Sequence, residues 1–531
     1  MTEIKRGVKR NSKRACGVLL PIFSLPSKYG IGTFSKEAYE FVDFLEESGQ
    51  TYWQILPLGP TSYGDSPYQS FSTFAGNPYF IDIESLIEEG LIKKADADAC
   101  DFGDNPEVID YEKLYRGRTS LLKSAYETMM KGAEKAAKNG ASKDMKGASS
   151  KKDIRALEKK KAFDKFKKTP DNSWLKDYAL FMVLKDLSGG RPWDTWDDGI
   201  RYRKKKALDE CYKKYAEDID FYCFLQFLFN EQWMKLKAYA NSKGISIVGD
   251  IPIYVAYDSA DTWASPELFL LDKDNLPIDV AGCPPDAFSA TGQLWGNPLY
   301  RWDYHKKTGY EWWMKRISHC YKLYDVVRID HFRGFDEYYA IPFGNPTAEH
   351  GEWRKGPGYE LFATMKEKLG NKRVIAEDLG FLTDSVRRLV KKTGYPGMKI
   401  LQFAFDAREE SDYLPHNYTS NCVVYTGTHD NDTTRGWFAS LPRADRSFAK
   451  KYLGIRYTKD VVPAMIRLAF ASVSDTVIIP MQDYLELDKT ARINIPSTLG
   501  GNWCWRMKDR ALTQELCAQV REYANIYGRL R

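Results

Sequence analysis

The 531-residue sequence lacks the segments and motifs that mark a membrane protein or a cofactor enzyme. No run approaches 18 consecutive apolar residues, so no membrane-spanning helix is predicted. No G-x-G-x-x-G follows a candidate strand, and the G-x-x-x-x-G-K-[ST], H-E-x-x-H and EF-hand patterns are absent. The six histidines are dispersed along the chain. The sequence therefore predicts no cofactor, no metal site and no membrane partner.

Paired cysteines are also missing. The nine cysteines are scattered, odd in number and form no C-x-x-C pair, which argues against a disulfide framework or structural zinc. The N-terminal segment is basic and then apolar, but its apolar part is short and lacks a small-residue cleavage site. We interpret that apolar part as the first strand of the fold and expect a cytoplasmic protein.

The net charge of +6 at pH 7 is confined to one stretch. Residues 131–168 hold 14 Lys and Arg but 5 Asp and Glu, so the rest of the chain is slightly acidic. A nucleic-acid surface would interleave its basic residues with stacking aromatics, and this stretch has Phe163 and Phe166 alone. We expect a solvated helical insertion and no nucleic-acid partner. Aromatic residues make up 14% of the chain, which weakly favours a carbohydrate ligand.

Four short β-branched runs each end on a carboxylate. They are ISIVGD with Asp250, DVVRID with Asp330, RVIAED with Glu377 and CVVYTGTHD with Asp430. Such runs are typical of buried parallel strands. Acids at the C-terminal tips of parallel strands lie on the face where (β/α)8 barrels keep their catalytic residues. One such acid could simply cap the next helix, but four in series favour catalysis.

Four further runs bring the number of candidate strands to eight, at 15–22, 51–58, 398–405 and 475–485. Amphipathic helical stretches, such as 36–49 and 384–394, separate most of the eight. This alternation predicts an α/β fold in which residues 1–531 form one (β/α)8 TIM barrel catalytic domain.

Uneven spacing of the strands predicts helical and loop insertions on the catalytic face. Residues 95–240, between the second and third strands, are expected to form a mostly helical subdomain with a mobile Lys-rich part at 131–168. Residues 254–312 are rich in Pro, Gly, Trp and Asp, and are expected to form a long loop over the site. About 47 residues follow the last strand, too few for a C-terminal β-sandwich domain.

The positions of the acids suit cleavage of a sugar bond. Retaining glycosidases place a carboxylate nucleophile and a proton donor roughly 5–5.5 Å apart, and neighbouring strand tips could hold Asp330 and Glu377 at that separation. Arg328 lies two residues before Asp330 on the same side of the strand, so it should lower the pKa of Asp330. Asp330 and Asp430 should raise the pKa of Glu377 and keep it protonated.

Six longer motifs stand in a fixed order along the chain: GDSPYQSFSTFAGNP (64–78), VGDIPIYVAYDSADTWA (248–264), PPDAFSATGQLWGNPLYRWDY (284–304), VRIDHFRGF (327–335), IAEDLG (375–380) and YTGTHDNDTTRGW (425–437). With these motifs the chain resembles the 4-α-glucanotransferases of the amylomaltase, or disproportionating-enzyme, type, which are relatives of the α-amylases. The resemblance runs from about Gly17 to Arg506, apart from the Lys-rich insertion.

The resemblance implies roles for particular residues. Asp330 would be the nucleophile, Glu377 the general acid/base and Asp430 the transition-state stabiliser. The residues expected to line the donor side are Arg328, His429, Asp250, Tyr68 and Ser66. Those expected to border the acceptor side are Gln293, Trp295 and Asn297. Tyr63 matches an aromatic of a second glucan-binding groove, and Ala287 departs from members that carry a Tyr over the acceptor site. No cofactor and no catalytic metal are implied.

The implied activity is that of a retaining transglycosylase in glycogen, starch or maltose metabolism. It would move α-1,4-glucan segments from a maltooligosaccharide, amylose, starch or glycogen chain to the 4-OH of another glucan or of glucose, through a covalent glucosyl-Asp330 intermediate. An α-1,4-glucan hydrolase of the α-amylase type, using the same acids, is the alternative. A glucan-binding protein without activity would be expected to lack one of Asp330, Glu377 and Asp430, and all three are present.

Overall fold

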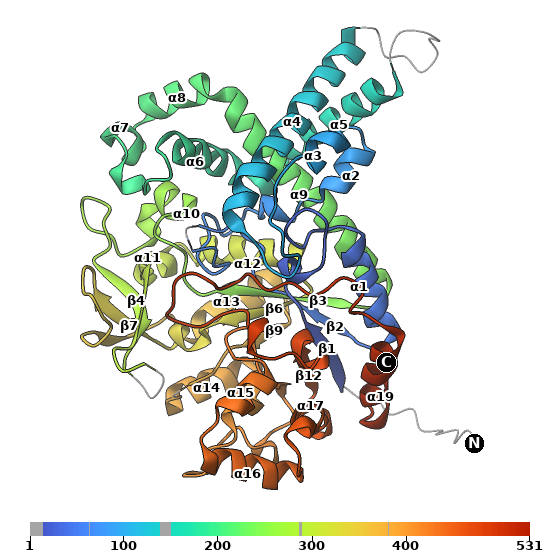
Figure 1. Ribbon diagram of the computed structural model, residues 1–531. Coiled ribbons are helices and arrows are strands. Elements are labelled where there is room, and N and C mark those ends of the chain that lie inside the picture. Colours follow the sequence, from blue (N-terminus) through green and yellow to red (C-terminus); the bar gives the residue numbers. More distant parts are fainter. Residues whose placement is uncertain (1–13, 63, 139–149, 286–288, 381, 531) are drawn as a thin grey trace.

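A closed barrel of parallel strands forms the centre of the structure, a computed structural model that describes residues 14–62, 64–138, 150–285, 289–380 and 382–530 (Figure 1). The eight strands are β1 (Ala15–Leu19), β2 (Tyr52–Gln54), β3 (Ser246–Pro252), β6 (Val326–Asp330), β9 (Val374–Ala376), β10 (Gly397–Ile400), β11 (Cys422–Tyr425) and β12 (Thr476–Pro480). They follow one another around the barrel in chain order, and β1 closes it by pairing with both β2 and β12. The predicted (β/α)8 barrel is confirmed.

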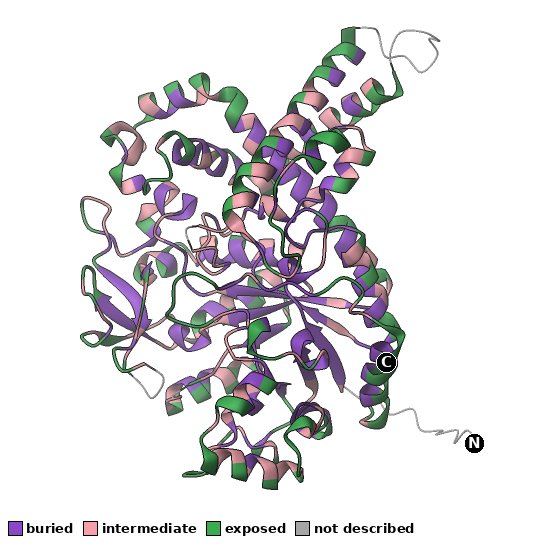
Figure 2. Ribbon diagram, viewed as in Figure 1, coloured by how far each residue is buried: buried purple, intermediate pink, exposed green. Residues whose placement is uncertain are grey.

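Side chains that point inward fill the barrel with apolar groups. This inner cluster consists of Leu19, Val248, Val326, Ile375, Met398, Ile400, Val423, Tyr425 and Ile478. A larger apolar core lies between the strands and the surrounding helices, so the barrel strands are buried on both faces (Figure 2). Burial on both faces explains why the strands read as continuous β-branched runs rather than as alternating patterns.

Helices surround the barrel. They are α1 (Lys36–Glu47), α9 (Ala216–Ser242), α12 (Glu311–Leu323), α13 (Tyr359–Leu369), α14 (Asp384–Thr393), α15 (Thr434–Ser440), α16 (Arg443–Leu453), α17 (Val461–Ala471), α18 (Met481–Tyr484) and α19 (Gln514–Ile526). Sequence chemistry sets their limits, as α14 illustrates. The Thr383 side chain accepts the Val386 N–H at its start, and Gly394, with φ of 73°, ends it in the left-handed conformation. Between them Val386 and Leu389 face the core.

A helical insertion separates β2 from β3. It contains α2 (Ile83–Glu88), α3 (Lys94–Asp98), α4 (Tyr111–Lys138), α5 (Lys151–Lys167), α6 (Leu175–Leu187), α7 (Asp198–Arg201) and α8 (Lys205–Lys214), before α9 returns to the barrel. Helices α4 and α5 pack side by side and stand out from the barrel; we call this pair the arm (Figure 1).

The Lys-rich stretch falls within the arm. Its residues 139–149 lie outside the described residues, and those on either side are helical. Gly132 of α4 touches α5 closely, since a Cβ there would lie 2.8 Å from the Ala156 Cβ. Phe163 is fully buried against Phe224 and Phe227 of α9, with ring centroids 5.6 and 5.7 Å apart. Helix α5 is therefore attached to the protein by an apolar contact as well as by charges.

The segment expected as one long loop after β3 contains more regular structure than the sequence indicated. It includes α10 (Ala260–Ala264), α11 (Trp302–Lys307), β4 (Asp279–Cys283) and β5 (Gln293–Pro298). These two strands join β7 (Glu337–Pro342) and β8 (Glu352–Lys355) in a second, antiparallel sheet of order β5-β4-β7-β8. Among the described residues after Pro480 there is no β-strand, and no described helix combines the length and apolarity needed to cross a membrane.

Candidate active site

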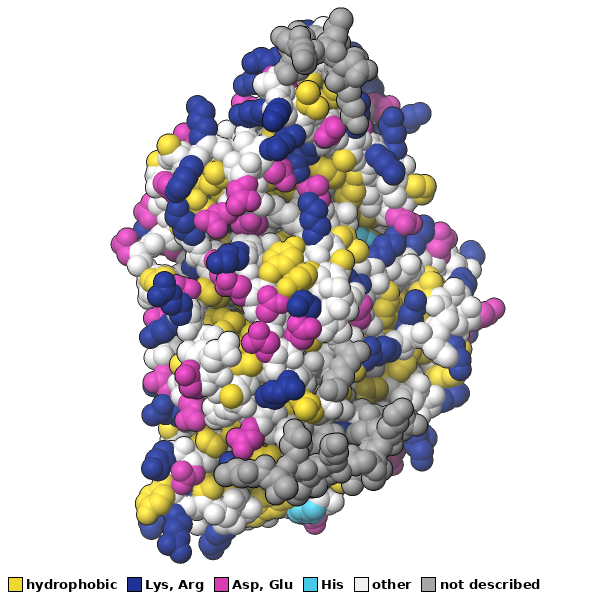
Figure 3. Space-filling model, turned by 90° about the vertical axis from the view of Figure 1, so that its right-hand side faces the viewer, with side chains coloured by type: hydrophobic (Ala, Val, Ile, Leu, Met, Phe, Trp, Pro, Cys, Tyr) yellow, Lys and Arg dark blue, Asp and Glu magenta, His cyan; other side chains and the backbone are white. Residues whose placement is uncertain are grey.

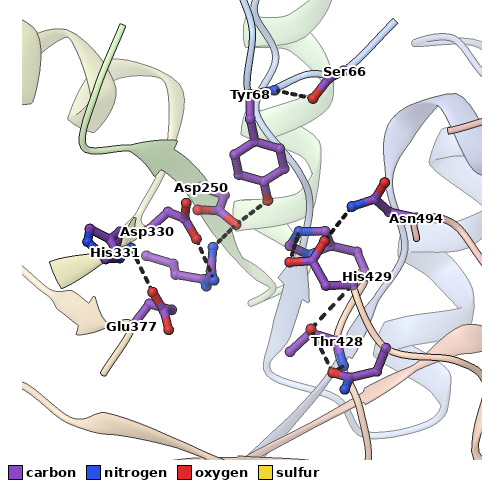
Figure 4. Close-up of polar contacts among 12 residues, drawn as sticks. Ser66, Tyr68, Asp250, Asp330, His331, Glu377, Thr428, His429 and Asn494 are labelled. Carbon is purple, nitrogen blue, oxygen red and sulfur yellow. Dashed lines mark hydrogen bonds and ion pairs between the residues drawn. The ribbon is translucent and has the colours of Figure 1, made fainter. Parts of the chain in front are cut away.

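Four acids gather at the C-terminal end of the barrel, as Figure 4 shows for Asp250, Asp330 and Glu377. Asp330 is the last residue of β6, Glu377 directly follows β9, and Asp250 lies within β3. The fourth acid departs from the prediction, because β11 ends at Tyr425 and Asp430 lies on the following loop. That loop carries Asp430 back to the barrel mouth, so the strand alone does not place it.

Asp330 and Glu377 leave neighbouring strands at the same level. Strands β6 and β9 pair in parallel, and Ile329 lies opposite Ala376 in their register. The next residue of each strand is therefore an acid, and paired strands lie about 4.8 Å apart. This spacing fits the separation of about 5–5.5 Å between two carboxylates that act on one glycosidic bond.

Arg328 links the carboxylates of β3 and β6. Its Nη1 lies 2.6 Å from Asp250 Oδ2, and its Nη2 lies 2.8 Å from Asp330 Oδ1. The Tyr68 hydroxyl donates to the same Asp250 Oδ2 at 2.9 Å, and the Tyr68 N–H donates to Ser66 Oγ at 3.3 Å. Two carboxylates therefore share one buried guanidinium.

The pKa of Asp330 depends on its burial and on the charged groups around it. Burial raises the pKa of Asp330 to about 6, and Arg328 offsets this only in part. Asp250 and Asp430 add negative charge nearby and push the pKa of Asp330 in the same direction as burial. Arg328 lowers the pKa of Asp330 as expected, but burial and the second carboxylate outweigh the ion pair, so the pKa of Asp330 stays above its usual value.

Glu377 is fixed by two backbone N–H groups. His331 N donates to Glu377 Oε2 at 2.7 Å, and Leu379 N donates to Glu377 Oε1 at 2.9 Å. Burial, and next the charge of Asp330, raise the pKa of Glu377 to about 7, against Arg328 and the two N–H donors. The effect of the Asp330 charge on Glu377 is as expected, and the charge of Asp430 raises the pKa of Asp330. Burial therefore raises the pKa of both carboxyl groups, and the direct contact with Arg328 favours the ionised form of Asp330.

His331 reaches Glu377 through an uncommon backbone conformation. It has φ of 52° and ψ of 49°, in the left-handed region that few residues other than glycine adopt. Its ring meets that of Trp295 edge-on, with centroids 4.7 Å apart. His331 thus contacts Glu377 through its backbone and Trp295 through its ring. This position was not predicted from its place in VRIDHFRGF.

Asp430 is held on two sides. His429 Nε2 lies 3.2 Å from Oδ2, and Asn494 Nδ2 donates to Oδ1 at 2.6 Å (Figure 4). Burial alone would raise the pKa of Asp430, but the charge and hydrogen bond of His429, with the bond from Asn494, hold it well below its usual value. Arg492 Nη2 donates to the Asp430 backbone oxygen at 2.8 Å. Asp430 is thus kept ionised while Glu377 is kept protonated.

His429 is in turn supported by Tyr68. Their rings stack with centroids 5.1 Å apart and an interplanar angle of 14°. Burial would lower the pKa of His429, but the adjacent Asp430 raises it above its usual value. The structure therefore brings all five predicted donor-side residues together: Arg328, His429, Asp250, Tyr68 and Ser66. Asn494 and Arg492 belong to the same group but were missed, because no strand or acidic motif marks them.

The three predicted acceptor-side residues, Gln293, Trp295 and Asn297, all lie on β5, whose register with β4 shifts between the Gly282–Leu294 and Val280–Pro298 pairs. Trp295 Nε1 donates to Gln293 Oε1 at 3.1 Å. Asn297 accepts from Gln69 Nε2 at 3.2 Å, which ties β5 to the loop that carries Tyr68. Tyr63 and Ala287 lie outside the described residues. In the part of the chain that the structure describes, no group of three His, Cys, Asp or Glu could hold a metal ion.

Comparisons with known proteins show the family to which the chain is similar. A family model described as 4-alpha-glucanotransferase matches residues 20–513. The chain is 49% identical to the 4-alpha-glucanotransferase of Clostridium butyricum over 510 residues, which are 96% of this chain and 99% of that protein. It is 45% identical to the 4-alpha-glucanotransferase of Thermus thermophilus over 524 residues, 97% of this chain and 99% of that one. Among solved structures, the amylomaltase from Streptococcus agalactiae in complex with acarbose is similar, with a TM-score of 0.89, 44% identity, and coverage of 98% of this chain and 100% of that one.

Proposed function

The chain belongs to the 4-alpha-glucanotransferase family of enzymes, and we propose that it moves α-1,4-glucan segments from one glucan to the 4-OH of another glucan or of glucose, with retention at the anomeric carbon. The donors would be maltooligosaccharides, amylose, starch or glycogen. The observation that carries this proposal is the pair Asp330 and Glu377, which leave neighbouring strands at the same level, with Asp330 in contact with Arg328 and the pKa of Glu377 raised by burial and by the charge of Asp330.

In the first step an oxygen of Asp330 attacks the anomeric carbon of the donor sugar. The glycosidic C–O bond breaks, and the leaving oxygen takes the proton of Glu377, so that a glucosyl-Asp330 ester and a shorter glucan result. The contact of Arg328 Nη2 with Asp330 Oδ1 supports this role, since it orients the carboxylate for attack by Oδ2. The raised pKa of Glu377 supports its role as the acid.

In the second step the 4-OH of an acceptor glucan attacks the same carbon. Glu377, now a carboxylate, takes the hydroxyl proton, and the bond to Asp330 breaks and restores the free carboxylate. Two inversions give net retention. The two backbone N–H groups on Glu377 support this half of the cycle, because they stabilise its ionised form and hold it in place.

Asp430 serves as the transition-state stabiliser in this proposal. Its bonds from His429 and Asn494 keep it ionised and fixed in orientation, so it can grip ring hydroxyls while positive charge develops at the anomeric carbon. Arg328, Asp250, Tyr68 and Ser66 surround the same donor sugar. A donor-side pocket of fixed dipoles of this kind loses little energy to reorganisation during the reaction.

The acceptor side favours transfer over hydrolysis. Gln293, Trp295 and Asn297 form a wall on β5, and its aromatic face suits the apolar face of a sugar ring. A sugar that covers this wall excludes water from the glucosyl-enzyme, which is the step at which a transferase and a hydrolase differ. No disulfide joins any of the cysteines that the structure describes, which supports a reducing, cytoplasmic setting.

Maltotriose tests the proposal directly. The protein should convert it to free glucose and a ladder of longer oligomers, which chromatography resolves. Glucose and maltose alone would instead indicate the hydrolase. The Asp330→Asn variant should lose transfer by at least about 10⁴-fold, because it keeps the shape of the side chain and removes the nucleophile. An unchanged thermal unfolding curve would show that the variant is folded, and near-normal transfer by it would remove Asp330 from the mechanism.

A further inference from the structure

Arg328 has a third contact besides its two carboxylates. Its Nε–H donates to the thioether sulfur of Met398, with 3.3 Å between Nε and Sδ. Both side chains are buried, at 3% exposure for Arg328 and 1% for Met398. The N–H donors of a guanidinium form a rigid, planar fork, so the direction of Nε fixes the directions of Nη1 and Nη2. The residue that receives Nε–H therefore influences how the fork meets Asp250 and Asp330.

Met398 is itself fixed in place. It is the second residue of β10, and its N–H donates to Asp378 Oδ1 at 2.7 Å. Asp378 follows Glu377 in the chain, so the same short segment supports the acid and the strand that carries the thioether. The preceding Gly397 has no room for a side chain, because a Cβ would lie 2.3 Å from Asp378 Oδ2. The Met398 side chain packs within the inner barrel cluster, which holds its sulfur beneath Arg328.

We propose that Met398 is a positioning residue for the transfer reaction: its thioether accepts the Arg328 Nε–H and so aims the guanidinium fork at Asp250 and Asp330. The chemistry of sulfur suits this task. It is a weak and neutral acceptor, so it satisfies a buried donor without drawing the positive charge away from the carboxylates. A carboxylate at 398 would compete with Asp330 for the guanidinium, and an aliphatic side chain would leave a buried N–H without an acceptor. This inference rests on the proposed function of Asp330.

Three variants test the role. Met398→Leu keeps the apolar volume and removes the acceptor. Met398→Gln keeps the length of the side chain and restores an acceptor oxygen. Met365→Leu is the matched control, because Met365 is also 1% exposed but lies on α13, outside the inner barrel cluster. For each variant we would measure kcat and KM with maltotriose, the pH profile of kcat/KM and the thermal unfolding midpoint.

Met398→Leu should lower kcat roughly tenfold and change KM by less than about twofold. It should also move the acid side of the pH profile upward, because a less well aimed Arg328 stabilises ionised Asp330 less. The other ionisable groups around Asp330, namely Asp250, Glu377, His429 and Asp430, stay unaltered in this variant. Met398→Gln should recover most of kcat and return the acid side toward its original position. Met365→Leu should change neither quantity.

A role in packing alone would give a different pattern. It would lower the unfolding midpoint and leave the acid side of the profile where it was. Unchanged kcat and profile in Met398→Leu, or equal losses in folded Met398→Leu and Met398→Gln, would overturn the inference. Should Met398→Gln fail to fold, the acid side of the Met398→Leu profile decides alone. Full transfer by Asp330→Asn would instead refute the proposed function, so the two failures are distinguishable.

Discussion

Charged side chains are buried at the barrel mouth, the C-terminal end of the barrel where the four acids lie, and exposed on the arm. At the mouth a few charged groups are buried and each has several partners, as with Arg328, which is 3% exposed and contacts two carboxylates. On the arm many charged groups stand in solvent, as with the Lys138–Glu134 pair, whose side chains are 73% and 64% exposed. Figure 3 shows Lys and Arg side chains spread over the upper part of the molecule, where the arm stands.

This difference explains why the large positive surplus of the arm should affect the protein less than the few charges at the barrel mouth. Coulombic attraction in water is weak and is screened by salt, so the surplus of the Lys-rich stretch adds little at any one place. Burial at the mouth strengthens each interaction and separates the titrations of neighbouring acids, so that Glu377 stays protonated while Asp430 stays ionised. The chemistry therefore depends on where a charge is buried and what it contacts, and the net charge of +6 says little about it.

After the loss expected for Asp330→Asn, the next largest effect is expected from Glu377→Gln. With maltotriose this variant should lose roughly 10³-fold in turnover, because the sugar leaving group receives no proton. With α-glucosyl fluoride the first step should persist, since fluoride departs with little proton assistance. The glucosyl group should then accumulate on Asp330, because Gln cannot activate the acceptor hydroxyl.

Mass spectrometry of the digested Glu377→Gln protein provides the measurement. The extra hexose should lie on the peptide that contains VRIDHFR, and the variant without substrate is the control. An adduct on another residue, or an equal loss of activity toward both substrates, would refute the assigned roles of Asp330 and Glu377.

A smaller effect is expected where the mouth and the surface contain the same kind of bond. Asn494 Nδ2 donates to Asp430, whose side chain is only partly exposed, at 42%, and Asn417 Nδ2 donates at 3.1 Å to Glu410, whose side chain is 75% exposed. Asn494→Ala should lower kcat/KM by about 10- to 100-fold, the usual range for a lost hydrogen bond to a charged group. Asn417→Ala, the matched control, should leave it unchanged. Similar values of kcat/KM for the two variants would show that the hydrogen bond at the barrel mouth matters no more than the one at the surface.

Much of the barrel could be predicted from sequence because buried parallel strands are continuous apolar runs. ISIVGD and DVVRID gave β3 and β6 nearly to the residue, and with them the positions of Asp250 and Asp330. The antiparallel sheet of β4, β5, β7 and β8 could not be predicted in the same way. Its central pair, β4 with β7, joins residues far apart in the chain, as Val280 with Ile341, and no local pattern specifies such partners.

The acids of the site could be predicted from the sequence, but many of the residues that contact them could not. Asn494 reaches Asp430 from 64 residues further along the chain, and an isolated amide has no signature of its own. The lowering of the Asp330 pKa by Arg328 was predicted, but the net rise was not, because the sequence shows neither the burial of Asp330 nor that Asp250 shares the guanidinium. The roles assigned to individual residues stay predictions until variants are measured.

The buried acids at the barrel mouth should also make activity depend on pH, with a change of about tenfold for each pH unit outside the optimum. Asp330 must be ionised to attack, so activity should fall as the pH drops below about 6 and this carboxylate gains a proton. Glu377 must be protonated to assist the leaving group, so activity should fall above about 7. With α-glucosyl fluoride the alkaline fall should disappear from the first step. An alkaline fall of equal size with both substrates would assign it to another group.

The smallest effects are expected on the arm, where two lysines allow a matched test. Lys159 is 11% exposed and contacts Glu89 and Glu231 at 2.8 and 2.7 Å, whereas Lys138 contacts Glu134 in solvent. Lys159→Met should lower the unfolding midpoint, because it leaves two half-buried carboxylates without their shared partner at a cost of about 1–2 kcal/mol. Lys138→Met should leave the midpoint unchanged. Neither variant should alter the rate of transfer from maltotriose per folded molecule, because neither lysine contacts the barrel mouth. If Lys159→Met slowed transfer as much as Asn494→Ala, charge on the arm would be coupled to the site, and the two regions could no longer be treated as independent.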